Sequence, residues 1–144
     1  MKLRALLVLG ALALAFQTDE NLKREFIDAR SGFSHAVSIE AGNVKTIYTS
    51  GQVGDGDDLL SQTRSAFENL QRRLEAAGAS LDDIVKLNTF IVNYKASDLD
   101  IFREVRFDIL GDHDRMPAHT LVGVETLAVA GDLIEIEAVA VVAK

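Results

Sequence analysis

His119 and the carboxylate pair Glu135 and Glu137 are side chains whose types and positions could line a polar binding site. His119 lies two residues after Pro117, the only proline in the chain. Proline has no amide proton to donate to a sheet, so it fits the first residue of a strand or the residue before it. An imidazole at the start of that strand titrates near neutral pH and could form the wall of a binding site. On the local pattern alone, the commoner role of such a histidine is a half-buried strand residue with one hydrogen bond.

Glu135 belongs to a second chemical feature, a pair of carboxylates in the last predicted strand, residues 133–142. Side chains alternate between the two faces of a strand, so Glu135 and Glu137 share one face while the other face is apolar. An unpaired carboxylate inside a dry core is strongly unfavourable. The pattern therefore predicts that this face either is exposed to solvent or borders a polar cleft.

Composition limits the classes of function. The chain has 144 residues, no cysteine and a formal net charge of −7. Without cysteine, disulfides, zinc–thiolate sites and thiol catalysis are excluded. A negative surface repels phosphate backbones, so nucleic acid is not an expected partner and RNA cleavage ranks last. No metal site is predicted, because the acidic loop 54–57 lacks the later ligands of a calcium loop and His113, between two aspartates, is typical of a solvated loop.

The N-terminus has the pattern of an export signal. Lys2 and Arg4 precede an apolar run over residues 5–15, which ends in the small–x–small pattern of a cleavage site. The run is too short to span a bilayer. We therefore predict a signal peptide over residues 1–15, export to the periplasm or the medium, no membrane attachment after its removal, and one domain over residues 16–144. The alternatives are an apolar helix that packs on the domain and a misassigned start.

Strands and helices follow one another in an order typical of an α+β protein. Two helices are predicted, one from an Asp58 cap to Gly78 and one from Ser97 to Gly111. The predicted strands are an edge strand at 23–28, a hairpin of 34–40 and 44–49, a strand at 84–92, a strand after Pro117 and the last strand. This order predicts one mixed sheet with two helices on one face.

Side-chain directions give three finer expectations. Strand 84–92 is expected to present one apolar face, made of Val85, Leu87, Thr89 and Ile91. The second helix is expected to bury Leu99, Phe102, Val105 and Ile109. If the last two strands pair across a turn near Ala130, Glu135 faces Glu125, so a site that joins His119 and Glu135 needs a bend in the sheet or a neighbouring subunit.

Six segments resemble, in order and spacing, the Rid family, also known as the YjgF family, whose members are described as enamine/imine deaminases or L-PSP endoribonucleases. The resemblance extends from about Phe33 to the C-terminus. The segments are Thr49–Gln52, Leu74–Gly78, Leu81–Lys86, Gly111–His113, Pro117–Ala118 and Ile134–Ala140.

This resemblance implies a chorismate-mutase-like fold and a homotrimer in which the sheets form a central barrel, with a small-molecule cleft at each subunit interface. It implies hydrolysis of reactive enamines and imines to ketoacids and ammonia without a cofactor. It assigns Glu135 as the carboxylate that orients water. The expected ligand-binding positions are Phe33, His35, Ser50, Gly51, Ala118 and Leu121.

His119 is the main departure from the family pattern, since it stands where the family's essential arginine follows Pro-Ala and clamps a substrate carboxylate. A neutral imidazole offers one donor and little charge near pH 7. Phe33 also replaces a tyrosine, and His35 a common glutamine. Two functions therefore remain open. One is a diverged hydrolase that uses His119, Glu135 and Ser50, with negligible turnover of 2-iminopropanoate; the other is a metabolite-binding or protective module without turnover.

Overall fold

The computed structural model describes residues 22–111 and 114–144. The predicted signal peptide, the start of the predicted domain at residues 16–21 and the loop residues Asp112 and His113 lie outside this part. Within the described residues, no helix has the length and apolar character needed to cross a membrane.

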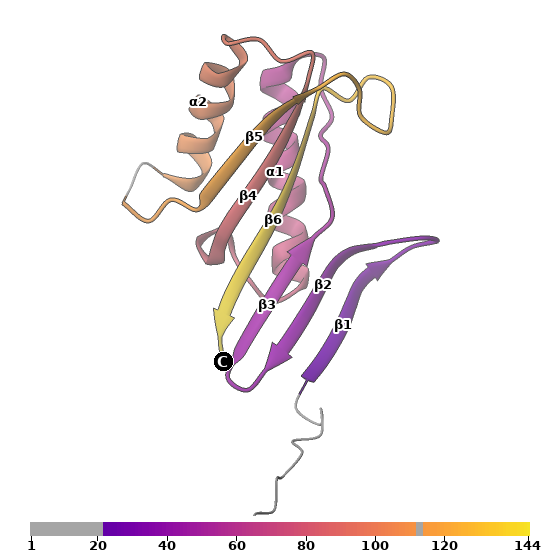
Figure 1. The fold of residues 1–144 in the computed structure, drawn as a ribbon, viewed down its shortest axis with the longest axis vertical. Coiled ribbons are helices and arrows are strands. Elements are labelled where there is room, and N and C mark those ends of the chain that lie inside the picture. Colours follow the sequence, from indigo (N-terminus) through magenta and orange to yellow (C-terminus); the bar gives the residue numbers. More distant parts are fainter. Residues whose placement is uncertain (1–21, 112–113) are drawn as a thin grey trace, which may run out of the picture.

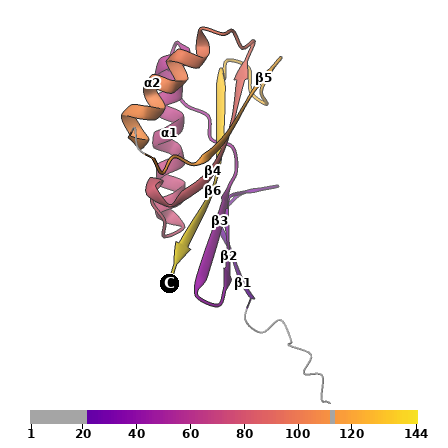
Figure 2. The same ribbon diagram turned by 60° about the vertical axis from the view of Figure 1, so that its left-hand side comes forward.

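A six-stranded mixed sheet forms one layer and two helices form the other (Figures 1 and 2). Both helices lie on the same face of the sheet, which confirms the predicted α+β architecture. Strands β4 and β5 run parallel, and the other neighbouring pairs are antiparallel. In spatial order the strands are β1 (Leu22–Ala29), β2 (Ser34–Ala41), β3 (Val44–Thr49), β6 (Ile134–Ala143), β4 (Ile84–Val92) and β5 (Ala118–Val124); the helices are α1 (Leu59–Ala76) and α2 (Asp98–Leu110).

Helix α1 supplies most of the helical side of the core. Asp58 caps its first turn through a hydrogen bond from the backbone N–H of Ser61 to Asp58 Oδ1, 2.8 Å long. Its apolar stripe is buried, and Gly78, at φ +78°, follows its C-cap Ala77. The stripe consists of Ala66, Phe67, Leu70, Leu74 and Ala77.

A β-bulge changes the predicted faces of β4. The register with β6 shifts between Ile84 and Lys86, so Ile84 is buried while Val85 is 47% exposed. A bulge inserts one unpaired residue and reverses the alternation on one side of it. The prediction that Val85 shares a buried face with Leu87 is therefore wrong, although Leu87, Thr89 and Ile91 are buried.

Two further expectations need correction. In α2, Phe102, Val105 and Leu110 are buried, whereas Leu99 and Ile109 are only partly buried. Strands β5 and β6 do not pair, because β4 lies between them. The nine residues between Val124 and Ile134 are long enough to cross the end of β4, a step of about 10 Å across the sheet. Glu135 consequently pairs with Phe90 rather than Glu125.

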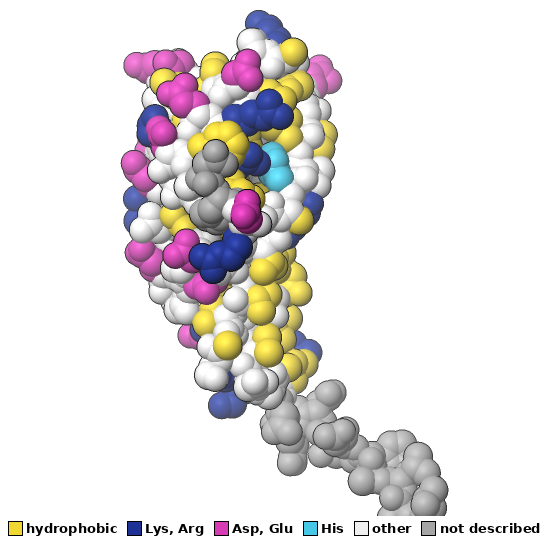
Figure 3. Space-filling view, turned by 90° about the vertical axis from the view of Figure 1, so that its left-hand side faces the viewer, with side chains coloured by type: hydrophobic (Ala, Val, Ile, Leu, Met, Phe, Trp, Pro, Cys, Tyr) yellow, Lys and Arg dark blue, Asp and Glu magenta, His cyan; other side chains and the backbone are white. Residues whose placement is uncertain are grey.

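The sheet face opposite the helices, termed the open face, carries many apolar side chains. Residues that alternate with the buried positions of the strands point to it. Its most exposed members include Phe26 at 63% and Tyr48 at 47%. Figure 3 shows hydrophobic side chains gathered over the lower half of the molecule. An apolar surface of this kind is typical of a face that another protein surface covers.

Candidate functional site

Glu135 lies on the open face in direct contact with Gly51. It alternates with the buried residues Ile134 and Ile136 of β6 and is itself half-buried. A Cβ atom placed on Gly51 would lie only 1.7 Å from Oε1 of Glu135. Since no side chain fits in that space, glycine at position 51 allows the carboxylate to rest against the backbone.

Backbone hydrogen bonds hold these two segments together. The N–H of Gln52 donates to the carbonyl of Ile136 (2.8 Å), and the N–H of Ile136 donates to the carbonyl of Gln52 (2.9 Å). Gln62 of α1 fixes the start of β6, because the N–H of Leu133 donates to its Oε1 (2.7 Å). The position of Glu135 is therefore set by rigid elements on both sides.

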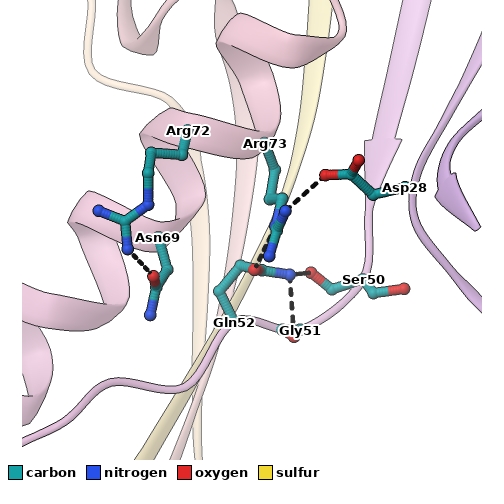
Figure 4. Close-up of polar contacts among 7 residues, drawn as sticks. All are labelled: Asp28, Ser50, Gly51, Gln52, Asn69, Arg72 and Arg73. Atoms are coloured by element: carbon teal, nitrogen blue, oxygen red, sulfur yellow. Dashed lines mark hydrogen bonds and ion pairs between the residues drawn. The ribbon is translucent and has the colours of Figure 1, made fainter. Parts of the chain in front are cut away.

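The segment Ser50–Gln52 is itself tightly hydrogen-bonded (Figure 4). Oγ of Ser50 donates to the carbonyl of Ser34 (2.6 Å), so this hydroxyl already has an acceptor. Nε2 of Gln52 donates to the carbonyls of Ser50 (2.8 Å) and Gly51 (3.1 Å). These hydrogen bonds therefore hold the segment Ser50–Gln52 in a fixed position beside Glu135.

Burial raises the pKa of Glu135, and the negative charges of Glu137 and Asp132 raise it further. Glu137 is two residues along the same face and accepts a hydrogen bond of 2.8 Å from Nδ2 of Asn88. A carboxyl group whose pKa moves toward neutrality exchanges protons more readily at physiological pH. A raised pKa is one requirement for a carboxyl group that acts as a general acid–base group.

His119 lies on the opposite side of the sheet from Glu135 within one chain. Its ring stacks on Phe102 of α2, with centroids 5.0 Å apart and an angle of 13° between the planes. Its Nε2 lies 3.1 Å from Oγ1 of the buried Thr89. Burial lowers the pKa of His119 to about 4, and the charges of Arg106 and Lys86 act in the same direction.

This environment leaves His119 neutral at pH 7. It corresponds to the half-buried strand histidine with one hydrogen bond that the local sequence pattern favours. Its neighbours on β5 differ: Ala118 is exposed, whereas Leu121 is half-buried against the core.

Phe33 and His35 lie beside Ser50. Their rings make an edge contact with centroids 5.0 Å apart, and Phe33 is 51% exposed. The N–H of Ser50 donates to the carbonyl of His35 (2.9 Å). Burial lowers the pKa of His35, with the charges of Arg73 and Arg30 adding to the effect and that of Asp28 opposing it.

The candidate residues therefore form two groups in one subunit. Phe33, His35, Ser50, Gly51 and Glu135 come together around the end of β3. The other group, Ala118, His119 and Leu121, lies on β5 at the far edge of the sheet, with β4 between β5 and β6.

Comparison with known proteins shows the family. The family model described as "Endoribonuclease L-PSP" matches residues 23–142. The chain belongs to this family.

Its relatives in the L-PSP family include proteins with a stated activity and proteins without one. The chain is 29% identical over 116 residues to a 2-iminobutanoate/2-iminopropanoate deaminase of Dermatophagoides farinae, covering 75% of this chain and 85% of the relative. It is 39% identical over 111 residues to the mitochondrial protein mmf2 of Schizosaccharomyces pombe, covering 72% and 83%. A Mycobacterium tuberculosis member of the YjgF/YER057c/UK114 family superposes with a TM-score of 0.70 at 28% identity, covering 83% of this chain and all of that one.

Three polar contacts of this L-PSP family member are not apparent from its sequence. Arg73 of α1 pairs through its Nη1 with Asp28 (2.5 Å), and its Nε contacts Gln52 Oε1 (3.4 Å). The hydrogen bond between Asn88 and Glu137 depends on the register of β4 with β6, which the sequence does not reveal. Among the described residues, no group of three or more His, Asp or Glu side chains is arranged to hold a metal ion.

Proposed function

We propose that this L-PSP family member is a homotrimer that binds a small electrophile in clefts between subunits, and that Glu135 activates water there for imine hydrolysis. The observation that carries the proposal is the Glu135 carboxylate, held against Gly51 on the open face and given a raised pKa by its surroundings. A fixed carboxylate of this kind suits a general base.

The trimer part of the proposal rests on the apolar open face. Phe26, Tyr48 and Val141 are exposed there although they are large and apolar. Symmetric association of the three sheets would bury this face in a closed barrel. The same closure would bring β5, which carries His119, near a neighbouring subunit, although the imidazole itself points to the helical side of its own sheet. At its low pKa the imidazole would then act as a neutral hydrogen-bonding group.

The reaction balances with water as the co-substrate. Glu135 takes a proton as water adds to the carbon of the protonated imine, which gives a carbinolamine. The carboxyl group returns that proton to nitrogen, and the carbinolamine collapses to a carbonyl compound and ammonium. The charge neighbours of Glu135 favour this role because a raised pKa matches the carboxyl group to both proton transfers.

Removal of the carboxylate charge tests the proposal. Glu135→Gln is expected to lower kcat/KM for an imine generated in situ by at least about 100-fold, the usual contribution of a general base. Glu68→Gln, an exposed carboxylate on α1, is the matched control and should leave the rate unchanged. Equal rates for wild type and Glu135→Gln, with the fold intact, would exclude Glu135 as the base.

A binding module without turnover is the second candidate. It is favoured by His119, which is neutral and engaged with Phe102 and Thr89 instead of offering a fixed cation. Saturable binding of a small molecule by wild-type protein, with no acceleration of imine hydrolysis, would support this candidate over the first.

Export is a separate proposal that rests on residues 1–15 of the sequence, with their positive start and short apolar run. The intact mass of the protein purified from its native host is expected to lack these residues. A full-length product in the cytosol would refute export without affecting the hydrolase proposal.

A further inference from the structure

Among the described residues, the charged groups that act on Glu135 are both negative. Glu137 lies two residues along the same strand face, about 7 Å away by strand geometry. Asp132 lies three residues before Glu135, in the turn that leads into β6. Burial is the first cause of the raised pKa of Glu135, and the negative charges of Glu137 and Asp132 raise it further. A ligand bound beside Glu135 therefore experiences a negative local field.

Lys86 is the basic residue that β4 contributes to the open face, but it is held at a distance from Glu135. It pairs with Val139, four residues along β6 from Glu135, which corresponds to about 13 Å of strand. Its ammonium group donates to Oγ1 of Thr120 on the neighbouring strand (2.6 Å). This contact directs the charge toward β5, away from Glu135.

Two other basic side chains of this region, Arg73 and His119, are also engaged elsewhere, and Arg30, whose charge acts on His35, is not among the charges that shift the pKa of Glu135. Arg73 reaches the back of the Ser50–Gln52 segment, where it pairs with Asp28 and contacts Gln52. His119 is neutral at pH 7 and packs on the helical side of the sheet. Neither group faces Glu135 within the described part of the subunit.

We infer that the cleft selects imines that carry no carboxylate, in their protonated iminium form, and that Glu137 is the residue that sets this preference. The inference rests on the proposed function, since it names the substrate class of the same site. An iminium ion is attracted by Glu135 and Glu137, whereas the carboxylate of a 2-imino acid is repelled. The reaction is R–CH=NH2⁺ + H2O → R–CHO + NH4⁺, with the bond from carbon to oxygen formed and the bond from carbon to nitrogen broken.

Glu137 is suited to this role because an uncharged hydrogen-bond donor holds its carboxylate in place. Asn88, which supplies its hydrogen bond, is uncharged. A unit charge about 7 Å from a ligand, when partly screened by solvent, changes the ratio of the affinities for a cation and an anion by about tenfold. Glu137→Gln removes the charge and keeps an oxygen that can accept the bond from Asn88, so the geometry of the strand is preserved.

A matched pair of substrates tests the inference. Ethanimine and 2-iminopropanoate differ only by the carboxylate, and oxidases generate them in situ from ethylamine and alanine. Hydrolysis is followed as the fall in semicarbazone formation when the protein is added. We expect wild type to have a higher kcat/KM for ethanimine than for 2-iminopropanoate. Glu137→Gln should lower the ratio of the two kcat/KM values by about tenfold, and Glu68→Gln should leave this ratio unchanged.

Each outcome of this experiment decides between the two claims. A preference for 2-iminopropanoate, or an unchanged preference in folded Glu137→Gln, overturns the charge selection and leaves the hydrolase proposal standing. If neither imine is hydrolysed, the hydrolase proposal fails, and binding of propylamine against propanoate, measured by ligand-observed NMR, decides the charge selection alone. Binding of propylamine that weakens in Glu137→Gln supports it; binding of propanoate, or of neither probe, overturns it.

Discussion

Gly51→Ala tests the contact on which the candidate site depends. The new Cβ would lie 1.7 Å from Oε1, 2.4 Å from Cδ and 2.6 Å from Cγ of Glu135. Ordinary contact requires about 3.5 Å, so the carboxylate must move by about 1.5 Å or more. Because Cγ is also too close, the side chain has to leave its position from the first torsion outward, and a shift of this size lowers kcat/KM by about 100-fold.

Gly51→Ala should also affect stability, in a way that depends on Glu135. The overlap is expected to destabilise the fold by about 1–3 kcal/mol. The backbone at position 51 does not require a positive φ. Once the overlap is removed, alanine at position 51 should therefore stabilise the fold by about 0.4–1 kcal/mol, because it lowers the conformational entropy of the unfolded chain.

A double-mutant cycle separates the destabilisation caused by the overlap from the stabilisation caused by alanine. Free energies of unfolding are measured by urea denaturation at one protein concentration for wild type, Gly51→Ala, Glu135→Ala and the double variant. Gly51→Ala is expected to destabilise wild type but not Glu135→Ala, which gives a coupling energy of about 1–3 kcal/mol. Additive effects within about 0.3 kcal/mol would show that the two residues do not touch, and the site as described would be wrong.

Three further predictions concern the fold and the assembly. The pKa of His119 falls from 6.5 to about 4 on folding, so the unfolded state binds more protons between these values and stability is lost as pH drops from 7 toward 4. The urea midpoint should therefore fall less over this pH range in His119→Gln than in wild type. An identical fall in both proteins would contradict this pKa. Tyr48→Lys places a charge on the open face, where the wild-type side chain is 47% exposed, and should convert the proposed trimer to a monomer, as measured by light scattering. An oligomer of unchanged size would place the interface elsewhere. Phe67→Ala empties a fully buried position and should lower the free energy of unfolding by about 3–5 kcal/mol, whereas a loss below 1 kcal/mol would contradict the packing described.

Local patterns predicted the elements of the fold well. The helix that starts at Asp58 and ends near Gly78 follows from a capping residue, an apolar stripe and a glycine, and all three act locally. Patterns failed where the backbone departs from regular alternation or where the order of the strands matters. The bulge that exposes Val85 changes no residue type, and the position of β4 between β5 and β6 is a property of the whole sheet.

The candidate site was predictable in part. Glu135 and Glu137 were recognisable because two carboxylates on one face of a strand require either solvent or a cleft. The contact of Glu135 with Gly51 requires two segments 84 residues apart (135 − 51) to meet through the bridge between Gln52 and Ile136. The sequence already indicated that His119 and Glu135 do not meet within one regular sheet, but the cause in the structure, β4 between β5 and β6, depends on the order of the strands.

The pKa of Glu135 is the measurement that tests the account most directly, because both proposals depend on it. Carbon-detected NMR of the side-chain carboxyl group gives this value in wild type and in Glu137→Gln. We expect the pKa of Glu135 to lie above the ordinary glutamate value, to fall in Glu137→Gln, and to match the acid limb of the kcat/KM profile for ethanimine. A pKa at or below the ordinary value, unchanged by the loss of the Glu137 charge, would contradict the account.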